Sequence, residues 1–261
     1  MVKLTRKNIL KKCNYSRKSK RIVILPRHDT FQKKVAILII GRIKGYTYVE
    51  KQLLKLQKMY NAKIFCSINK KNKSEYINKF CSVFNIKDEQ LNLEFTPNPP
   101  EFMYKLRQSA PIVISNMYSC LFHKQRCFDL LEKYQKKYNN NFDYVIYYRA
   151  DIDNKQDFIL HTLEPNTIYI PAYSDQNSRN IETDGINDQI AYGSYEIMKK
   201  YLSSLFSLEK ISLQYNILYH PELFLKKYLI DENKISVKIF PFNYELHEGR
   251  TEPLADYDNF E

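Results

Sequence analysis

The sequence predicts an α/β fold in which helices flank a mostly parallel central sheet. Short continuous apolar runs recur along the chain, as expected of strands that are buried on both faces of a parallel sheet. Between these runs lie segments with an apolar residue every three or four positions, a spacing typical of helices that pack on a sheet. The 261 residues are 44% hydrophobic, which is enough to build one substantial core.

The first part of the chain predicts a unit of strand, helix and strand. Residues 35–40, VAILII, form the first apolar run, and residues 63–67 form the second strand. The helix between them is marked by its apolar face: Tyr48, Val49, Leu53, Leu56 and Tyr60. This order is that of a β-α-β unit. A further helix is expected over residues 75–84, and the prolines at 97–100 mark a loop.

The remainder of the chain continues the alternation. A long amphipathic helix is expected over residues 117–138. Its candidates for burial are Leu121, Phe128, Leu131 and Tyr138. Further elements are expected as strands at 144–148 and 167–170 and as helices around 194–206 and 221–230. No internal repeat and no long linker interrupts this order, so a single domain is predicted for residues 35–261.

The positive charge is concentrated at the N-terminus. The formal net charge is +12, of which residues 1–34 contribute +11 and the other residues only +1. We interpret residues 1–34 as a basic arm. It contains no recognisable nucleic-acid-binding module, so nucleic acid is expected as a partner only through this arm, and a solubilising tail is the other interpretation.

Cysteine content and hydropathy favour a cytoplasmic protein. The five cysteines form no CxxC pair, a pattern more typical of a reducing compartment than of a disulfide scaffold. The basic start lacks the apolar stretch of a signal peptide. No apolar run approaches the roughly 20 residues that cross a bilayer, so no membrane span is expected.

The glycines exclude two common phosphate-binding motifs. There are only five, and none falls in GxGxxG or GxxxxGK[ST]. An α/β protein that binds a nucleoside diphosphate without such loops must neutralise the phosphates by other means. Mg²⁺ or Mn²⁺ held by carboxylates would do so, because these cations prefer oxygen ligands.

Two aspartates provide such carboxylates. Asp151 and Asp153 directly follow the strand at 144–148 and therefore emerge at the carboxyl edge of the sheet, where ligands of open α/β sheets bind. The alternative is a solvated turn, in which Asp is common. His247 could complete a metal shell. A second DxD at 256–258 has no strand before it, and we interpret it as accidental.

Other segments carry further candidates. Gly41 and Arg42 end the first strand, where a small residue lets a nucleotide approach and a guanidinium can pair with phosphate; a tight turn is the alternative for Gly41. Asp188 lies in a polar segment and could either accept a proton from an acceptor hydroxyl or cap a helix. Glu222 begins a helix, where an acid favours the helix dipole.

In order, these segments resemble the small GT-A nucleotide-diphospho-sugar transferases of large DNA viruses and some bacteria. The matching stretches are VAILIIGRIKGYTYVEKQLLKL, HKQRCFDLLEKYQKKYNNNFDYVIYYRADI, GINDQIAYGSYEIMKKY and HPELFLKKYL. The resemblance covers approximately residues 35–250 and leaves the basic arm without a counterpart. It implies that the α/β fold is a GT-A-like sandwich.

The resemblance implies roles on the donor side of a reaction. Gly41 and Arg42 would lie at the nucleotide. Asp151 and Asp153 would hold the metal and the donor phosphates, and Arg149 would support the donor.

It also implies roles on the acceptor side. Asp188 would lie beside the acceptor as the catalytic base, and Glu222 would lie in the acceptor region. His247 would match the place of a late metal-binding histidine.

The predicted function is metal-dependent transfer of a sugar from a nucleotide-sugar to a hydroxyl of a glycan or protein acceptor, with inversion at the sugar. A UDP-sugar is the expected donor, on the frequency of UDP in the family. One alternative is a nucleotidyltransferase that makes the activated sugar, although such enzymes usually have a glycine-rich opening loop. The other is a non-enzymatic binding module, in which the arm contacts nucleic acid or another polyanion in a strongly salt-dependent way.

Overall fold

The computed structural model describes residues 33–41, 43, 46–105, 111–154, 156–172, 185–217 and 221–246. Residues 1–32 of the expected basic arm lie outside the described residues, as do Arg42, His247 and the second DxD. The last two residues of the arm are described. Lys33 Nζ donates a 2.7 Å hydrogen bond to the hydroxyl of Tyr144, and the main-chain N–H of Lys34 donates one of 2.8 Å to the Asp143 carboxylate.

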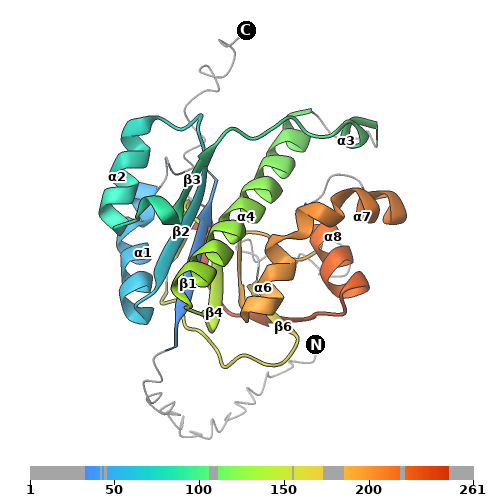
Figure 1. Ribbon diagram of the computed structural model, residues 1–261. Coiled ribbons are helices and arrows are strands. Elements are labelled where there is room, and N and C mark those ends of the chain that lie inside the picture. Colours follow the sequence, from blue (N-terminus) through green and yellow to red (C-terminus); the bar gives the residue numbers. More distant parts are fainter. Residues whose placement is uncertain are drawn as a thin grey trace, which may run out of the picture. The chain divides into compact units, whose positions relative to one another are not determined.

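One sheet of seven strands organises the described part of the chain, in the order β3-β2-β1-β4-β7-β6-β8 (Figure 1). These strands are β1 (Val35–Ile40), β2 (Lys63–Asn69), β3 (Leu91–Glu94), β4 (Tyr144–Arg149), β6 (Thr167–Pro171), β7 (Ile190–Gly193) and β8 (Ser236–Phe240). β7 is antiparallel to both of its neighbours, and the other strand pairs are parallel. The sequence-based prediction of an α/β fold with a mostly parallel sheet is confirmed.

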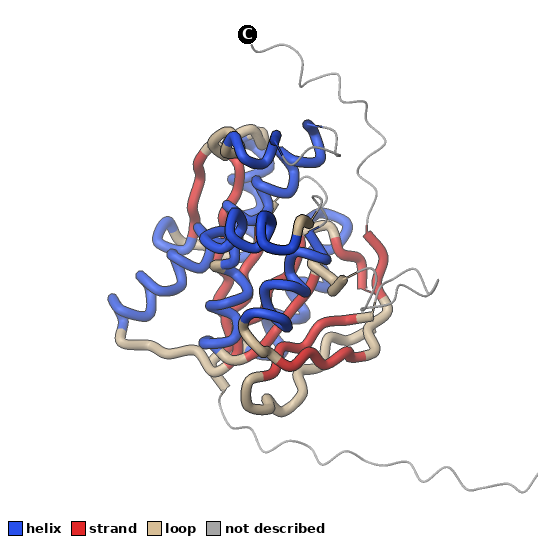
Figure 2. Tube along the Cα trace, turned by 90° about the vertical axis from the view of Figure 1, so that its right-hand side faces the viewer, coloured by secondary structure: helices blue, strands red, loops and turns tan. Residues whose placement is uncertain are grey.

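Helices cover both faces of this sheet. The helices are α1 (Tyr46–Tyr60), α2 (Ser74–Phe84), α3 (Glu101–Lys105), α4 (Pro111–Tyr138), α6 (Tyr195–Leu202), α7 (Leu208–Tyr215) and α8 (Pro221–Lys226). Short 3-10 segments follow at Asp88–Gln90 and Ser204–Ser207, and a π-helical segment, Lys227–Glu232, continues α8. α1 and α2 lie on one face, whereas α4, α6, α7 and α8 lie on the other (Figure 1; Figure 2 gives the perpendicular view).

The two faces of β1 show why this strand is a continuous apolar run. Successive side chains of a strand point to opposite faces. Val35, Ile37 and Ile39 pack with α1 and α2, whereas Ala36, Leu38 and Ile40 pack with α4 and the C-terminal helices. A polar residue at any of these positions would be buried, so a central strand covered on both sides has no alternation of polar and apolar residues.

Most elements expected from the sequence are present, whereas the strands β3, β7 and β8 and the helices α3 and α7 were not expected. α4 begins at Pro111 rather than near residue 117, and the side chain of Tyr138 is 45% exposed, so its expected burial is wrong. Tyr134, one turn earlier, packs in the core instead, and the Tyr138 hydroxyl donates to Glu89. The strand β7 was not expected, because its four residues, which end at Gly193, belong to a segment rich in polar residues that is typical of a loop.

The described residues also bear on the expected environment of the protein. No helix among them has the length and hydropathy needed to cross a bilayer. Cys66, Cys81, Cys120 and Cys127 are free thiols. Cys127 is buried, and its Sγ donates to the carbonyl of Phe65 at 3.3 Å, so this cysteine has a packing role.

Candidate active site

Three segments meet at the carboxyl edge of the sheet because of the register of β1, β4 and β7. Ile40 pairs with Arg149 at the ends of two parallel strands. Ile190, the first residue of the antiparallel β7, pairs with Tyr148. The reversed direction of β7 therefore brings the residues that precede Ile190 to the same edge as the residues that follow Arg149.

Arg149 and Asp151 form an ion pair with two hydrogen bonds at the end of β4. Arg149 Nε lies 3.0 Å from Asp151 Oδ1, and Nη2 lies 2.6 Å from Oδ2. The two side chains are 29% and 24% exposed. Burial alone would lower the pKa of the guanidinium, but the adjacent Asp151 carboxylate reverses this and raises it. The planar guanidinium is thus held as a fixed positive charge at the sheet edge.

Asp153 is held by α1 from one side and by the C-terminal strand β9 from the other. It lies in β5 (Ile152–Asn154), which pairs antiparallel with β9 (Tyr244–Leu246) in a two-stranded sheet. Gln52 Nε2 on α1 donates a 3.1 Å hydrogen bond to Asp153 Oδ1. The charges of Asp153 and Asp151, after burial itself, raise the pKa of Tyr148, so both carboxylates act on this tyrosine.

The pairing of β5 with β9 also bears on His247. Ile152, between the two aspartates, is paired with Leu246. His247 itself lies outside the described residues. The chain therefore leaves β9 beside the DxD segment, and the role of His247 as a metal ligand remains a prediction.

Asp188 lies in an extended segment whose main chain is fixed on both sides. Gly185 adopts a φ of +91°, and a Cβ there would lie 2.3 Å from the main-chain carbon of Glu222. The N–H of Ile186 donates to the carbonyl of Glu222 at 3.1 Å. The buried Asn187, directly before Asp188, donates to the Tyr244 hydroxyl at 2.6 Å, and its side-chain oxygen accepts at 2.9 Å from the N–H of Gln189, directly after Asp188. The structure thus brings the first turn of α8 and the strand β9 against this segment.

Gly41 follows β1 at the same edge. Its φ is +93°, a conformation that favours glycine. Among the described residues, nothing lies within 4 Å of the place that a Cβ would occupy. The turn explains why glycine is present, and the open side of its backbone is compatible with close approach of a ligand. Arg42 is outside the described residues.

The donor set at this edge suits a hard divalent cation that is shared with a phosphate. Mg²⁺ and Mn²⁺ are commonly held by one or two carboxylates together with substrate oxygens rather than by a closed protein cage. No group of three or more His, Cys, Asp or Glu side chains with metal-binding geometry occurs among the described residues. Asp151 and Asp153 offer oxygen donors of the kind that these cations prefer, and their role as metal ligands remains a prediction.

A second polar cluster lies at the carboxyl ends of β2 and β3 and was missed in the sequence. His123 on α4 is 1% exposed, with Nδ1 2.8 Å from Ser67 Oγ and Nε2 3.0 Å from Thr96 Oγ1. Burial lowers the pKa of His123 to about 4, so the ring is neutral at neutral pH. Both ring nitrogens have partners, and the cluster fixes α4 against the sheet.

Gln52 and Lys124 are further residues of the site that the sequence-based prediction missed. A signal was available for both, because each interrupts the apolar face of a helix. Gln52 precedes Leu53 on α1, and Lys124 lies three residues after Leu121 on α4. Lys124 is buried and Gln52 is half-buried, and burial of a polar group requires a specific partner.

Comparison with models of known protein families and with curated proteins found no match to this chain. The candidate site is therefore assigned from its own geometry.

Proposed function

We propose that the protein is a metal-dependent glycosyltransferase that uses a nucleotide-sugar, with a UDP-sugar as the expected donor. The observation that carries the proposal is the meeting of Arg149, Asp151, Asp153 and the Asp188 segment at one sheet edge. The mostly parallel sheet with helices on both faces is compatible with the GT-A-like sandwich that the sequence resemblance implies.

On the donor side, the residues supply charge for a leaving diphosphate. Asp151 and Asp153 would hold Mg²⁺ or Mn²⁺, which stabilises the negative charge that develops as the bond from the anomeric carbon to oxygen breaks. Arg149 is oriented by both oxygens of Asp151, and its remaining N–H groups would donate to a phosphate. Gln52 orients the Asp153 carboxylate through its hydrogen bond.

On the acceptor side, Asp188 is the proposed base. Its carboxylate would accept the proton of an acceptor hydroxyl, on a glycan or a protein, as the oxygen attacks the anomeric carbon from the face opposite the leaving group. This displacement inverts the configuration at the sugar. Glu222 adjoins the Asp188 segment through its main chain, which is consistent with a place in the acceptor region.

The test is a screen of nucleotide-sugars by thermal shift and by donor turnover, with Mn²⁺, with Mg²⁺ and with a chelator. The variant Asp153→Asn keeps an acceptor for Gln52 but removes the charge that a cation needs. We expect one donor to stabilise the wild type only with the metal and the variant to lose this effect. Product with the inverted anomeric configuration is also expected.

The matched control is Asp157→Asn. Asp157 lies four residues further along the chain and makes an exposed ion pair with Lys55, away from the sheet edge. It should behave as wild type. Binding of no donor under any metal condition would contradict the proposal and direct attention to polyanion binding by the arm. A retained anomeric configuration would contradict inversion alone.

A further inference from the structure

A buried lysine lies directly behind the Asp188 segment. Lys124 is on α4, within the core, and only 1% of the residue is exposed. Most buried lysines are paired with a carboxylate, because transfer of an unpaired charge out of water is unfavourable. The partners that the structure gives to Lys124 are of another kind.

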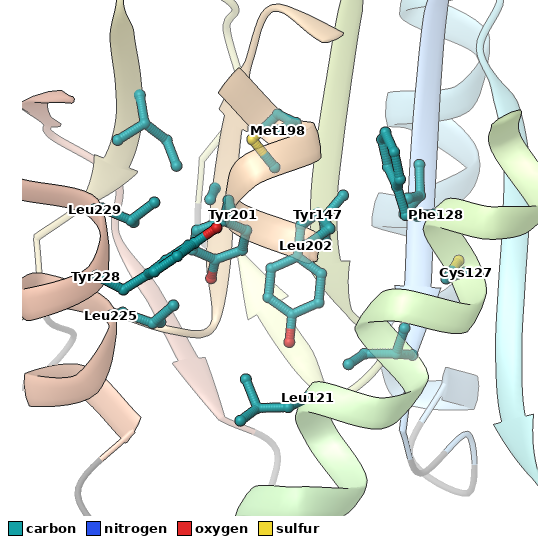
Figure 3. Close-up of a cluster of buried hydrophobic side chains, with 14 of the residues drawn as sticks. Leu121, Cys127, Phe128, Tyr147, Met198, Tyr201, Leu202, Leu225, Tyr228 and Leu229 are labelled. Atoms are coloured by element: carbon teal, nitrogen blue, oxygen red, sulfur yellow. The ribbon is translucent and has the colours of Figure 1, made fainter. Parts of the chain in front are cut away.

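Among the described residues, the contacts of Lys124 are with neutral groups. Its Nζ lies 3.4 Å from the carbonyl oxygen of Asp188 and 3.1 Å from the hydroxyl of Tyr201. The same ammonium lies 4.4 Å from the centre of the Tyr147 ring and 4.5 Å from that of Tyr201. Figure 3 shows Tyr147 and Tyr201 in the core between α6 and the turn of α4 that carries Leu121. Two rings and two oxygens therefore surround the charge.

The fold does not need this charge for its stability if an apolar side chain of the same length can fill the position. Replacement of buried charges by well-packed apolar residues is often neutral or stabilising. The packing around Lys124 consists of tyrosine rings that a methionine could also contact. A buried charge that stability alone does not require, next to a candidate site, indicates a role in that site.

Lys124 contacts the main chain of Asp188, the candidate base. Ile190 pairs with Tyr148 in the antiparallel pair of β7 and β4, so Asp188, two residues before Ile190, lies beside the end of β4. Gly185 and Ile186 are anchored to Glu222 on one side of Asp188, and Asn187 is anchored to Tyr244. The ammonium contacts the carbonyl of Asp188 itself, at 3.4 Å.

We infer that Lys124 is a positioning residue for Asp188: it holds the main chain at Asp188 so that the carboxylate faces the acceptor hydroxyl. The inference rests on the proposed function, in which Asp188 is the base. A base displaced by about 1 Å from its productive position can lose on the order of 100-fold in rate.

The test is a double-mutant cycle between Lys124→Met and Asp188→Asn, with Lys133→Met as the matched control. Lys133 is exposed on the same helix. For Lys124→Met we expect a fall in kcat on the order of 100-fold with an unchanged KM for the donor. The melting temperature should equal or exceed that of the wild type, and the amides of residues 186–190 should exchange faster with solvent. In the Asp188→Asn background, Lys124→Met should have almost no further effect, because Lys124 acts through Asp188.

Tyr201→Phe provides a second variant, since it keeps the ring and removes only the hydroxyl that holds the ammonium. It should lower kcat in the same direction and by less. Additive losses in the cycle, or a fall in melting temperature together with loss of donor binding, would show a structural role and overturn the inference. Wild-type turnover that survives in Lys124→Met would also overturn it while leaving the proposed function in place. Absence of turnover in the wild type with every donor would overturn both.

Discussion

At the scale of single residues, Asp153 depends on a partner from outside the DxD segment. Gln52 on α1 donates to Asp153 Oδ1, and the other amide atom, Oε1, is buried without a hydrogen-bond partner among the described residues. Hydrogen bonds of this kind orient metal ligands, and their loss typically lowers metal affinity about 10- to 100-fold. We therefore expect Gln52→Ala to weaken Mn²⁺ binding by that factor, as measured by the Mn²⁺ dependence of donor turnover and by calorimetry.

Gln57→Ala is the control for this variant. Gln57 is on the same helix, and its amide donates to the carbonyl of Phe84, away from the site. The control should lose some stability and keep its Mn²⁺ affinity. Equal Mn²⁺ affinity in Gln52→Ala and the wild type would contradict a role for Gln52 in the metal site.

His123 provides a pH-dependent contribution to the free energy of unfolding. Burial lowers its pKa to about 4, whereas an unfolded histidine has a pKa near 6.5. Between these values the unfolded state binds more protons, so stability falls as the pH decreases. The contribution is fully present above about pH 6.5 and is lost as the pH falls through about 4. Its size is on the order of 3 kcal/mol.

Denaturant unfolding at about pH 7 and about pH 4 would measure this contribution. Carboxylates also lose stability in acid, so the comparison is with His123→Asn, which can keep one of the hydrogen bonds to Ser67 or Thr96. The variant should lose less stability between the two pH values than the wild type does. Titration of His123 near pH 6.5 in the folded protein, observed by NMR, would exclude the effect.

At the scale of elements, the sequence predicts long helices and long apolar strands well and short elements poorly. The run at 35–40 has apolar residues on both faces, and the helical spacing of 48–60 extends over several turns, so each carries its own signal. β7 has four residues and β9 three, too few to show a period. The position of Asp188 beside Arg149 depends on β7 being antiparallel, which no local pattern encodes.

The packing of the Asp188 segment against α8 depends on Gly185. An alanine there would be strained by the positive φ, and its Cβ would lie 2.3 Å from the main-chain carbon of Glu222. Gly41→Ala is the matched control, because φ is similar, at +93°, and the described residues leave open space around the added Cβ. We expect Gly41→Ala to lose about 1–2 kcal/mol of unfolding free energy from backbone strain.

Gly185→Ala should lose clearly more than this control, because main-chain atoms of α8 must move in addition. Denaturant melts of both variants would give the difference. Hydrogen exchange should also show increased opening of residues 186–190 in Gly185→Ala alone. Equal losses in the two variants would mean that the contact with Glu222 is easily relaxed.

At the scale of the whole chain, the alternation of strands and helices in the sequence predicts the fold class. The sequence predicts the candidate site only in part. Asp151 and Asp153 could be found because they follow a strand that is recognisable by itself. Lys124 and Gln52 could not be assigned a role, because their partners, Asp188 and Asp153, are 64 and 101 residues away in the sequence. Contacts over such separations are set by tertiary packing, on which single-sequence patterns give no information.

The boundary of the basic arm allows a last prediction, made with two truncations. The described residues, from Lys33 to Leu246, belong to one compact unit. Removal of residues 1–32 lowers the formal net charge from +12 to +3 and keeps the contacts of Lys33 and Lys34 with Asp143 and Tyr144. This form should retain the melting temperature and donor turnover of the full chain, and any binding to polyanions should weaken steeply, because each lost cation reduces counterion release.

Removal of residues 1–34 also eliminates the hydrogen bonds to β4 and should cost on the order of 2 kcal/mol of unfolding free energy. Equal stability of the two truncated forms would place the start of the folded unit after Lys34. Loss of turnover in the form that comprises residues 33–261 would assign the arm a part in catalysis.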